Sequence, residues 1–137
     1  MDISALAGLL FRGLPANLHL KDCDSRYLAA SEQYVTSQGF SDFEEMRGRT
    51  DLDLGCSAEQ FERIRNIEMQ LMRGELDRYD EDEFTTLPDR AVWFRASRSA
   101  VLNVDGSPAG VVAILMNITQ LKHSEEQLTA ALDELSA

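Results

Sequence analysis

The chain has 137 residues, of which 44% are hydrophobic and 27% charged, so it suits one globular domain and is neither disordered nor collagen-like. Acidic residues outnumber basic ones by 24 to 13, and this net charge of −11 opposes binding to nucleic acid or to an anionic membrane surface. No apolar run approaches the ~20 residues of a membrane span, and the N-terminus lacks the basic residues of a secretory signal. The two cysteines have neither the number of a disulfide framework nor the spacing of a zinc site. Together these observations favour a reducing, cytoplasmic location.

A helix and a β-hairpin are expected in the first 30 residues. Apolar residues at positions 3, 6, 7 and 10 form one helical stripe, which Gly13 and Pro15 end. Two short strand-like runs follow, Asn17–Lys21 and Arg26–Ala30. The polar turn formers between them predict a hairpin.

Helical signals dominate the next 45 residues. Ser31 is a capping residue for a short helix through position 35, which Gly39 closes. The stretches Ser41–Glu44 and Ser57–Gln60 each have the spacing of a capping box, and the second opens the longest internal helix, which Gly74 ends. The apolar face of that helix comprises Phe61, Ile64, Ile67 and Leu71.

Three strands are expected next. They are predicted at Glu81–Leu87, Ala91–Val104 and Gly110–Asn117. Pro88 follows the first strand, and the Asp105-Gly106 turn joins the other two as a hairpin. Because the last run is almost entirely apolar, it predicts a central strand that is covered on both faces.

The tail has a heptad pattern. Positions 118, 121, 125, 128, 132 and 135 are spaced 3-4-3-4-3, and all are apolar except Glu125. Since such a seam is buried only against another helix, we predict a homodimer through the terminal helices, with a coiled-coil seam of Leu121, Leu128, Leu132 and Leu135. The alternative is a helix that folds back on its own sheet. The seam still runs at the last residue, which favours a longer parent protein.

The predicted order is helix, two strands, several short helices, three strands and helix. Grouping of the helices between the second and third strands predicts an α+β fold. Its centre is a five-stranded antiparallel sheet with short helices on one face, extended by a helix at each end of the chain.

Three stretches of the sequence carry a resemblance to the PAS domain, the sensory module of bacterial signalling proteins. In chain order they are LFRGLPANLHLKDCDSRYLAAS, GFSDFEEMRGRTDLDL and AVWFRASRSAVLNVDGSPAGVVAILMNITQLKHSEEQL. The third is the most specific, because a strand-opening Trp93, a D-G turn, a G-V-V strand and an N-I-T sequence lead into a heptad helix. The resemblance as a whole extends over about Leu10 to Gln127, most of the chain.

The resemblance implies three regions: an N-terminal amphipathic helix at 1–13, a PAS sensor domain at 14–118 and the start of a coiled-coil signalling helix at 119–137. It also implies a regulatory rather than catalytic chain that relays a signal to a C-terminal output domain, such as a histidine kinase of a two-component system or a diguanylate cyclase. The relay would pass through Asn117, Ile118 and Thr119. Asn117 stands where the family usually has Asp, so its coupling is expected to be weaker or differently switched.

The chain carries no recognisable catalytic constellation. We interpret His19, on a strand, as structural and His123, in the terminal helix, as solvated. Cys56 lies outside the N-C-R-F-L-Q-like helix of flavin-binding light sensors. The longest helix lacks a His for haem, and its Met69 and Met72 are interpreted as core residues. We therefore expect no enzymatic activity, no metal and neither flavin nor haem, while an unknown small molecule stays open.

Two groups of charged residues each have two interpretations. The acidic cluster at positions 77–83 is either a divalent-metal site or strand-edge charge that prevents edge pairing, which we prefer. Arg95 and Arg98 are three apart and so face opposite sides of a strand. An inward arginine needs an anionic partner. This partner is a carboxylate on a small ligand or, as we prefer, Asp89 or a helix carboxylate.

Strand alternation and the resemblance together give the candidate ligand-binding residues. They are Leu52, Ile64, Phe84, Trp93, Arg95, Val112 and Ile114. We expect a ligand beneath the longest helix, or the movement of a partner, to shift the last strand and so to rotate the paired terminal helices. The alternative is a ligand-free protein–protein interaction and dimerisation module whose own side chains fill the cavity.

Overall fold

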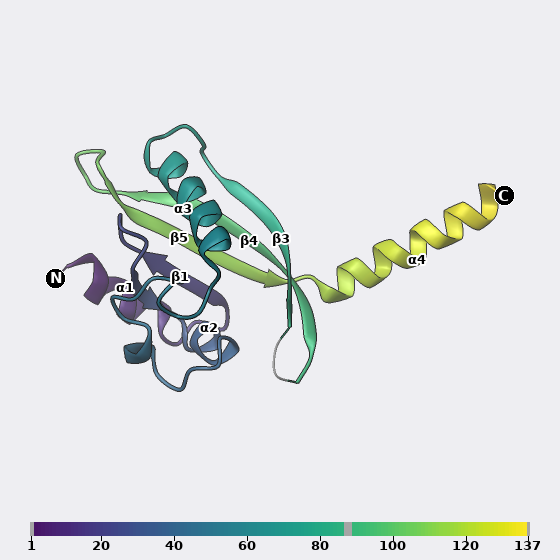
Figure 1. Cartoon of the computed structure of the whole chain (residues 1–137), viewed down its shortest axis with the longest axis horizontal. Helices are drawn as coiled ribbons and strands as arrows, with labels where there is room; N and C mark the ends of the chain where they lie inside the picture. Colours follow the sequence, from purple (N-terminus) through teal and green to yellow (C-terminus); the bar gives the residue numbers. More distant parts are fainter. Residues whose placement is uncertain (1, 87–88, 137) are drawn as a thin grey trace.

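The computed structural model describes residues 2–86 and 89–136, and it contains a five-stranded antiparallel sheet (Figure 1). The strands are β1 (Asn17–Lys21), β2 (Tyr27–Ala30), β3 (Tyr79–Thr86), β4 (Ala91–Leu102) and β5 (Pro108–Asn117). The helices are α1 (Ile3–Phe11), α2 (Glu32–Ser37), α3 (Ala58–Met72) and α4 (Thr119–Ser136), with a 3-10 turn η1 (Phe43–Glu45). The strand order is β2-β1-β5-β4-β3. This architecture confirms the predicted α+β fold.

Most predicted elements are present with ends shifted by one or two residues. The third expected strand begins at Tyr79 rather than Glu81, and its expected end at Leu87, like Pro88, lies outside the described residues. The first capping box starts at Asp42, not at Ser41, because the Glu45 carboxylate accepts the Asp42 backbone N–H at 3.1 Å.

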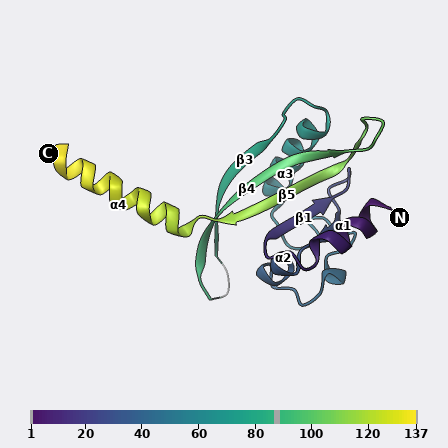
Figure 2. The same ribbon diagram turned by 180° about the vertical axis from the view of Figure 1, so that it is seen from behind.

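The two faces of the sheet are covered by different helices. On the inner face, α3 packs against β5 through a cluster of Ile64, Ile67, Leu71 and Val111. On the outer face, α1 packs against the first hairpin through Ala7, Leu20 and Ala29. Figure 2, which views the molecule from behind, shows α1 in front of β1.

β5 is the central strand, as expected, but the prediction that both of its faces are covered is wrong. Its inward residues Val111 and Ala113 are buried, whereas the outward Ile114 and Met116 are 49% and 61% exposed. The cluster around α1 extends along β5 only to Val112. The C-terminal half of the strand therefore presents an apolar outer face.

Gly110 allows β5 to approach β1 closely at the start of their pairing. A Cβ at this position would lie 2.0 Å from the carbonyl oxygen of Lys21, well inside van der Waals contact. Only glycine fits there without separating the two strands.

α4 extends away from the rest of the molecule (Figure 1). Ile118, at its start, is buried. The seam residues Leu121, Leu128, Leu132 and Leu135 are 44–83% exposed. The alternative in which this helix folds back on its own sheet is therefore wrong, and its apolar stripe has no cover within the described chain. None of the described helices combines the length and the apolar character that crossing a membrane requires.

Candidate functional site

A cavity of about 380 Å³ lies against the inner face of the sheet, where α2, the loop after η1 and the first turns of α3 meet it. Polar groups from the strands, from α2 and from the loop after η1 form much of its wall. The residues that contribute them are His19, Lys21, Tyr27, Tyr34, Asp51, Glu83 and Arg98. Cys56 also lines the cavity, and burial raises the pKa of its thiol.

The alternation of β1 places its polar residues in this wall. Leu18 and Leu20 point to the outer face, so His19 and Lys21 point inward. Arg98 of β4 is paired with Ala113 of β5 in the sheet and faces inward as well. The sheet therefore turns polar side chains toward its own helices.

Lys21 is the centre of a buried charge network. Its Nζ atom lies 2.6 Å from Asp51 Oδ2 and 3.3 Å from Glu68 Oε2. The side chains of Lys21 and Glu68 are each only 2% exposed. Ser25 donates to Glu68 Oε1 at 2.7 Å from a turn in which its φ is +63°. Since each charge has a close partner, the network avoids the penalty of an isolated buried ion.

Two tyrosines extend this network by a directed chain of hydrogen bonds. Tyr27 donates its hydroxyl proton to Asp51 Oδ1 at 2.5 Å, and its oxygen lies 3.1 Å from the Tyr34 hydroxyl. Because Tyr27 has only one hydroxyl proton, Tyr34 must be the donor in the second bond. Burial raises the pKa of both tyrosines, so both stay neutral. Burial alone would raise the pKa of Asp51, but the charge and hydrogen bond of Lys21 hold it below its ordinary value.

His19 is held between the two tyrosine rings. Its ring centroid lies 5.2 Å from that of Tyr27 and 4.8 Å from that of Tyr34. Burial, and then the neighbouring charge of Lys21, lower its pKa well below the ordinary histidine value. The imidazole is therefore neutral in the folded chain. Its Nδ1 atom is buried without a hydrogen-bond partner among the described residues.

Arg98 has donors that no described residue satisfies. Its side chain is 7% exposed, and its Nη2 atom donates to Glu83 Oε1 at 3.1 Å. Nε and Nη1 are buried and have no hydrogen-bond partner in the described chain. A buried unsatisfied donor costs roughly 1–3 kcal/mol. Because Arg98 lines the cavity, these two donors indicate that an acceptor is missing at this point of the described structure.

The partner that we preferred for the inward arginine, Asp89 or a helix carboxylate, is wrong. The two arginines do face opposite sides of the sheet, as their spacing predicted, with Arg98 inward and Arg95 outward, but both pair with β3 rather than with Asp89 or a helix. Glu83 binds Arg98 on the inner face, and Asp82 binds Arg95 on the outer face at 2.8 Å.

Of the seven predicted ligand-binding residues, only Ile64 lines this cavity. Leu52 is 45% exposed in a turn outside the lining. The other five lie on the outer face, opposite α3, and these are Phe84, Trp93, Arg95, Val112 and Ile114. On each strand, the predicted residues therefore alternate with the inward-facing ones, and their side chains point to the face of the sheet opposite the cavity.

The acidic cluster of β3 forms ion pairs along an edge strand. Glu81 binds Arg63 of α3 at 2.7 Å, and Asp82 binds Arg95 and Lys122. Within residues 2–86 and 89–136, no three His, Cys, Asp or Glu side chains are grouped so that they could hold a metal ion.

The start of α4 is tied to β3 and β4. The Ile118 N–H donates to the Trp93 carbonyl at 2.8 Å, and the Trp93 N–H donates to Thr119 Oγ1 at 3.0 Å. One turn later, Lys122 Nζ lies 3.0 Å from Asp82 Oδ2 and 4.8 Å from the Trp93 ring centroid. Asn117 Oδ1 accepts the Thr119 N–H at 3.0 Å, which holds the turn that leads into the helix. Both strands therefore fix the direction in which α4 leaves the sheet.

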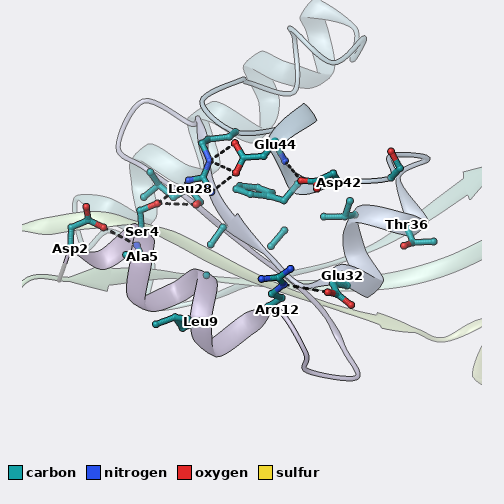
Figure 3. Close-up of a pocket in the computed structure, with 17 residues that line it drawn as sticks. Asp2, Ser4, Ala5, Leu9, Arg12, Leu28, Glu32, Thr36, Asp42 and Glu44 are labelled. Carbon is teal, nitrogen blue, oxygen red and sulfur yellow. Dashed lines mark hydrogen bonds and ion pairs between the residues drawn. The ribbon is translucent and has the colours of Figure 1, made fainter.

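A second, larger cavity of about 790 Å³ lies between α1, β2, α2 and η1 (Figure 3). Its charged residues already have partners within the chain. Arg12 pairs with Glu32 at 3.5 Å, and the Asp2 carboxylate accepts the Ala5 N–H at 2.8 Å, as Figure 3 shows. This groove presents no buried donor that lacks an acceptor among the described residues, so the inner cavity is the better candidate.

Sequence reasoning missed most of the polar wall of the inner cavity. The predicted ligand-binding residues did not include Lys21, Tyr27, Tyr34 or Asp51. They included Arg95 in place of Arg98. A signal was present in β1, where polar residues at 17, 19 and 21 alternate with leucines. Glu68 gave a second signal, since it lies four residues after Ile64 and so on the apolar face of α3.

The comparisons with known proteins agree with this architecture. A family model described as the PAS fold matches residues 11–123, well over half of the chain. The sequence has no match among curated proteins.

Three solved structures illustrate the similarity of the fold. VqmA bound to DPO is 19% identical, with a TM-score of 0.69 over 81% of this chain and 55% of that one. A Vibrio cholerae VqmA–ligand–DNA complex is 17% identical, with a TM-score of 0.70 over 94% and 58%. The PAS domain of Bordetella pertussis BvgS is 18% identical, with a TM-score of 0.63 over 96% and 99%. The present chain thus spans little more than half of the VqmA chains.

Proposed function

Because this chain belongs to the PAS fold family, whose domains are sensory modules, we propose that it binds a small molecule in the inner cavity and passes the binding event to α4. The observation that carries the proposal is Arg98, a buried guanidinium in the cavity wall with two donor atoms that lack acceptors among the described residues. A ligand that supplies an acceptor would relieve that penalty. The volume of the cavity falls in the range of small-molecule sites.

β3 offers a route from the cavity to α4. Glu83 binds Arg98 on the inner face, and its neighbour Asp82 binds Lys122 of α4 on the outer face. A ligand that changes the hydrogen bonding of Arg98 also changes the ion pair between Arg98 and Glu83. A resulting shift of β3 at Glu83 would move the neighbouring Asp82 as well. We propose that this movement, together with the β4 bonds to Ile118 and Thr119, changes the direction of α4.

We further propose that α4 pairs with the same helix of a second copy. The stripe from Leu121 to Leu135 is exposed, and soluble proteins rarely leave such a stripe uncovered. VqmA is described as a dimer, which makes a dimer plausible for a chain of the same fold. The paired helices would lead to an output domain in a longer parent chain, such as a histidine kinase of a two-component system or a diguanylate cyclase in the cytoplasm.

The chain itself is proposed to be regulatory rather than catalytic. One VqmA structure is a complex with DNA, but this chain spans only part of that protein, and its charge of −11 opposes contact with a phosphate backbone. We also propose that neither flavin nor haem is bound. Neither Met69 nor Met72 lies in the lining of the cavity, and Met72 packs in the core under α3.

A ligand-free protein–protein interaction module is the second candidate. It is favoured by the apolar outer face, where Phe84, Ile114 and Met116 are 49–61% exposed. In that case the orphaned donors of Arg98 would hold only water, and a partner on the outer face would be the signal.

Release of a bound molecule tests the proposal. Protein purified from cells under native conditions is denatured, and the extract is analysed by mass spectrometry. Thr85→Trp fills the cavity, whereas Thr86→Trp adds the same bulk on the outer face. We expect the wild type and Thr86→Trp to release a bound molecule and Thr85→Trp to release none. An extract that is empty for all three proteins would favour the ligand-free alternative.

A further inference from the structure

The charges around the cavity define the class of ligand, an inference that rests on the proposed function. We propose that the cavity binds an uncharged small molecule with a carbonyl acceptor and an N–H donor, as in a primary amide, and that it discriminates against a carboxylate of the same shape.

The wall is already balanced in charge. Two positive groups, Lys21 and Arg98, face two carboxylates, Asp51 and Glu83. Behind Lys21, Glu68 adds a third carboxylate, which is buried. Arg65 is linked to Glu68 through Ser25, because it donates to Ser25 Oγ at 2.8 Å and Ser25 donates to Glu68. A ligand that brought a further negative charge would enter without a cation of its own. Burial of such a charge is strongly unfavourable.

What the wall lacks is an acceptor rather than a charge. The positive charge of Arg98 is matched by Glu83, yet its Nε and Nη1 donors remain without partners among the described residues. A neutral carbonyl oxygen satisfies such a donor without changing the charge of the cavity.

The tyrosine chain adds the complementary group. Since Tyr34 gives its hydroxyl proton to Tyr27, the Tyr34 oxygen keeps its acceptor capacity, and Tyr34 is one of the residues that line the cavity. A ligand N–H is the natural partner for that oxygen. An amide carries both groups on one plane, whereas a carboxylate carries acceptors only. The rings of Tyr27, Phe40 and Phe94 in the same lining suit an aromatic or cyclic body attached to the amide.

Benzamide and benzoate are matched probes for this inference, because they differ in charge and donor capacity but hardly in shape. Each is titrated into the ¹⁵N-labelled wild-type protein, and the chemical shifts of the Arg98 side chain and of the Gln38 and Gln60 amides in the lining are followed. We expect benzamide to bind about tenfold more tightly than benzoate or better. Equal or tighter binding of benzoate, or no shift with benzamide, overturns the inference.

Glu83→Gln sharpens the experiment, since it removes one negative charge from the wall and leaves the shape unchanged. In this variant we expect the preference for benzamide over benzoate, measured as the ratio of their dissociation constants, to fall at least tenfold. Glu81→Gln is the control on the same face of β3, because Glu81 binds Arg63 and does not line the cavity. Its preference should match the wild type. If Glu83→Gln folds and its ratio of benzoate to benzamide dissociation constants equals that of the wild type, charge balance does not set the preference. If Glu83→Gln does not fold, the comparison of benzamide with benzoate in the wild type still tests the inference.

Failure here is distinct from failure of the proposed function. An anionic molecule released from purified protein, together with a preference for benzoate, would leave the chain a ligand-binding sensor and overturn only the ligand class. A neutral amide-bearing molecule in the extract would support both. An empty extract from wild type and both tryptophan variants, with no binding of benzamide, would overturn both.

Discussion

The two faces of the sheet reverse the usual arrangement of a globular protein. The inner face, under α2 and α3, buries Lys21, Glu68 and Arg98, whereas the outer face exposes Ile114 and Met116. On the inner face, charge is tolerated because nearly every group has a close partner. On the outer face, apolar side chains remain uncovered beyond the reach of α1. The difference shows that the covered face carries paired charges beside a cavity, whereas the C-terminal half of β5 leaves apolar side chains exposed on the other face.

The largest effect is expected from breaking the inner network. Lys21→Met leaves Asp51 and Glu68 without their shared cation, so we expect the free energy of unfolding to fall by about 3–5 kcal/mol. Urea denaturation monitored by circular dichroism measures this loss. Arg73→Met is the control, because it breaks the exposed Arg73–Glu75 pair, and it should cost no more than about 1 kcal/mol. Similar losses for both variants would remove the distinction between the buried and exposed pairs.

The exposed stripe of α4 gives the next largest effect. If α4 pairs as proposed, replacing Leu128 and Leu132 together by Ala should raise the dissociation constant of that pairing about 100-fold, since it removes roughly 3 kcal/mol of apolar contact. Sedimentation equilibrium provides the measurement. Gln120→Ala with Gln127→Ala changes the same helix away from the heptad positions and should leave association intact. If the leucine variant associates as the wild type does, the seam is not the interface.

His19 predicts a pH dependence that belongs to the inner face alone. Its folded pKa lies well below 6.5, so below this pH the unfolded chain takes up a proton that the folded chain does not. The free energy of unfolding should therefore decrease as the pH falls below 6.5, by up to about 1.4 kcal/mol per pH unit. Urea midpoints at pH 7.0, 6.0 and 5.5 test this slope.

The second histidine of the chain provides the control for that slope. His123 is exposed on α4, so His123→Gln should retain the wild-type decrease, whereas His19→Gln should lose it. A decrease that persists in His19→Gln would assign the pH dependence to another group.

The smallest effect on stability is expected at the contact between the outer face and α4. Arg95 and Lys122 lower the pKa of Asp82 to about 2, so the ion pair is intact at neutral pH and is lost only as the pH falls through about 2. Asp82→Asn should loosen the first turn of α4 while leaving global unfolding almost unchanged. Faster hydrogen exchange at the amides of Lys122, His123 and Ser124 would report this.

Asp80→Asn is the matched variant on the same strand and face, because Asp80 pairs with Arg78 and not with α4. In Asp80→Asn, hydrogen exchange at the amides of the first turn of α4 should equal that of the wild type. Equal exchange in both variants would show that β3 does not hold the helix, and the proposed route would have to run through β4 alone.

The fold could be predicted from local signals, whereas the site could not. Breakers such as Gly13 and Gly74 and the cap at Ser57 mark element ends, because turn and cap chemistry acts within a few residues. The location of the cavity depends on which residues of each strand face α3. The apolar alternation of Val112 and Ile114 suggested the inner face, but these side chains point outward. Arg98, rather than Arg95, is the arginine that reaches the cavity.

The sequence by itself determined the order of strands and helices, the antiparallel sheet and the heptad stripe of α4, because periodicity and turn residues encode these locally. Only the tertiary structure decided which face of the sheet lines the cavity. A shift of one residue exchanges the two faces of a strand, and the usual preference for apolar residues inside fails where buried charges neutralise each other. Lys21, Asp51 and Glu68 come from three separate segments, so their mutual compensation exists only once the chain has folded.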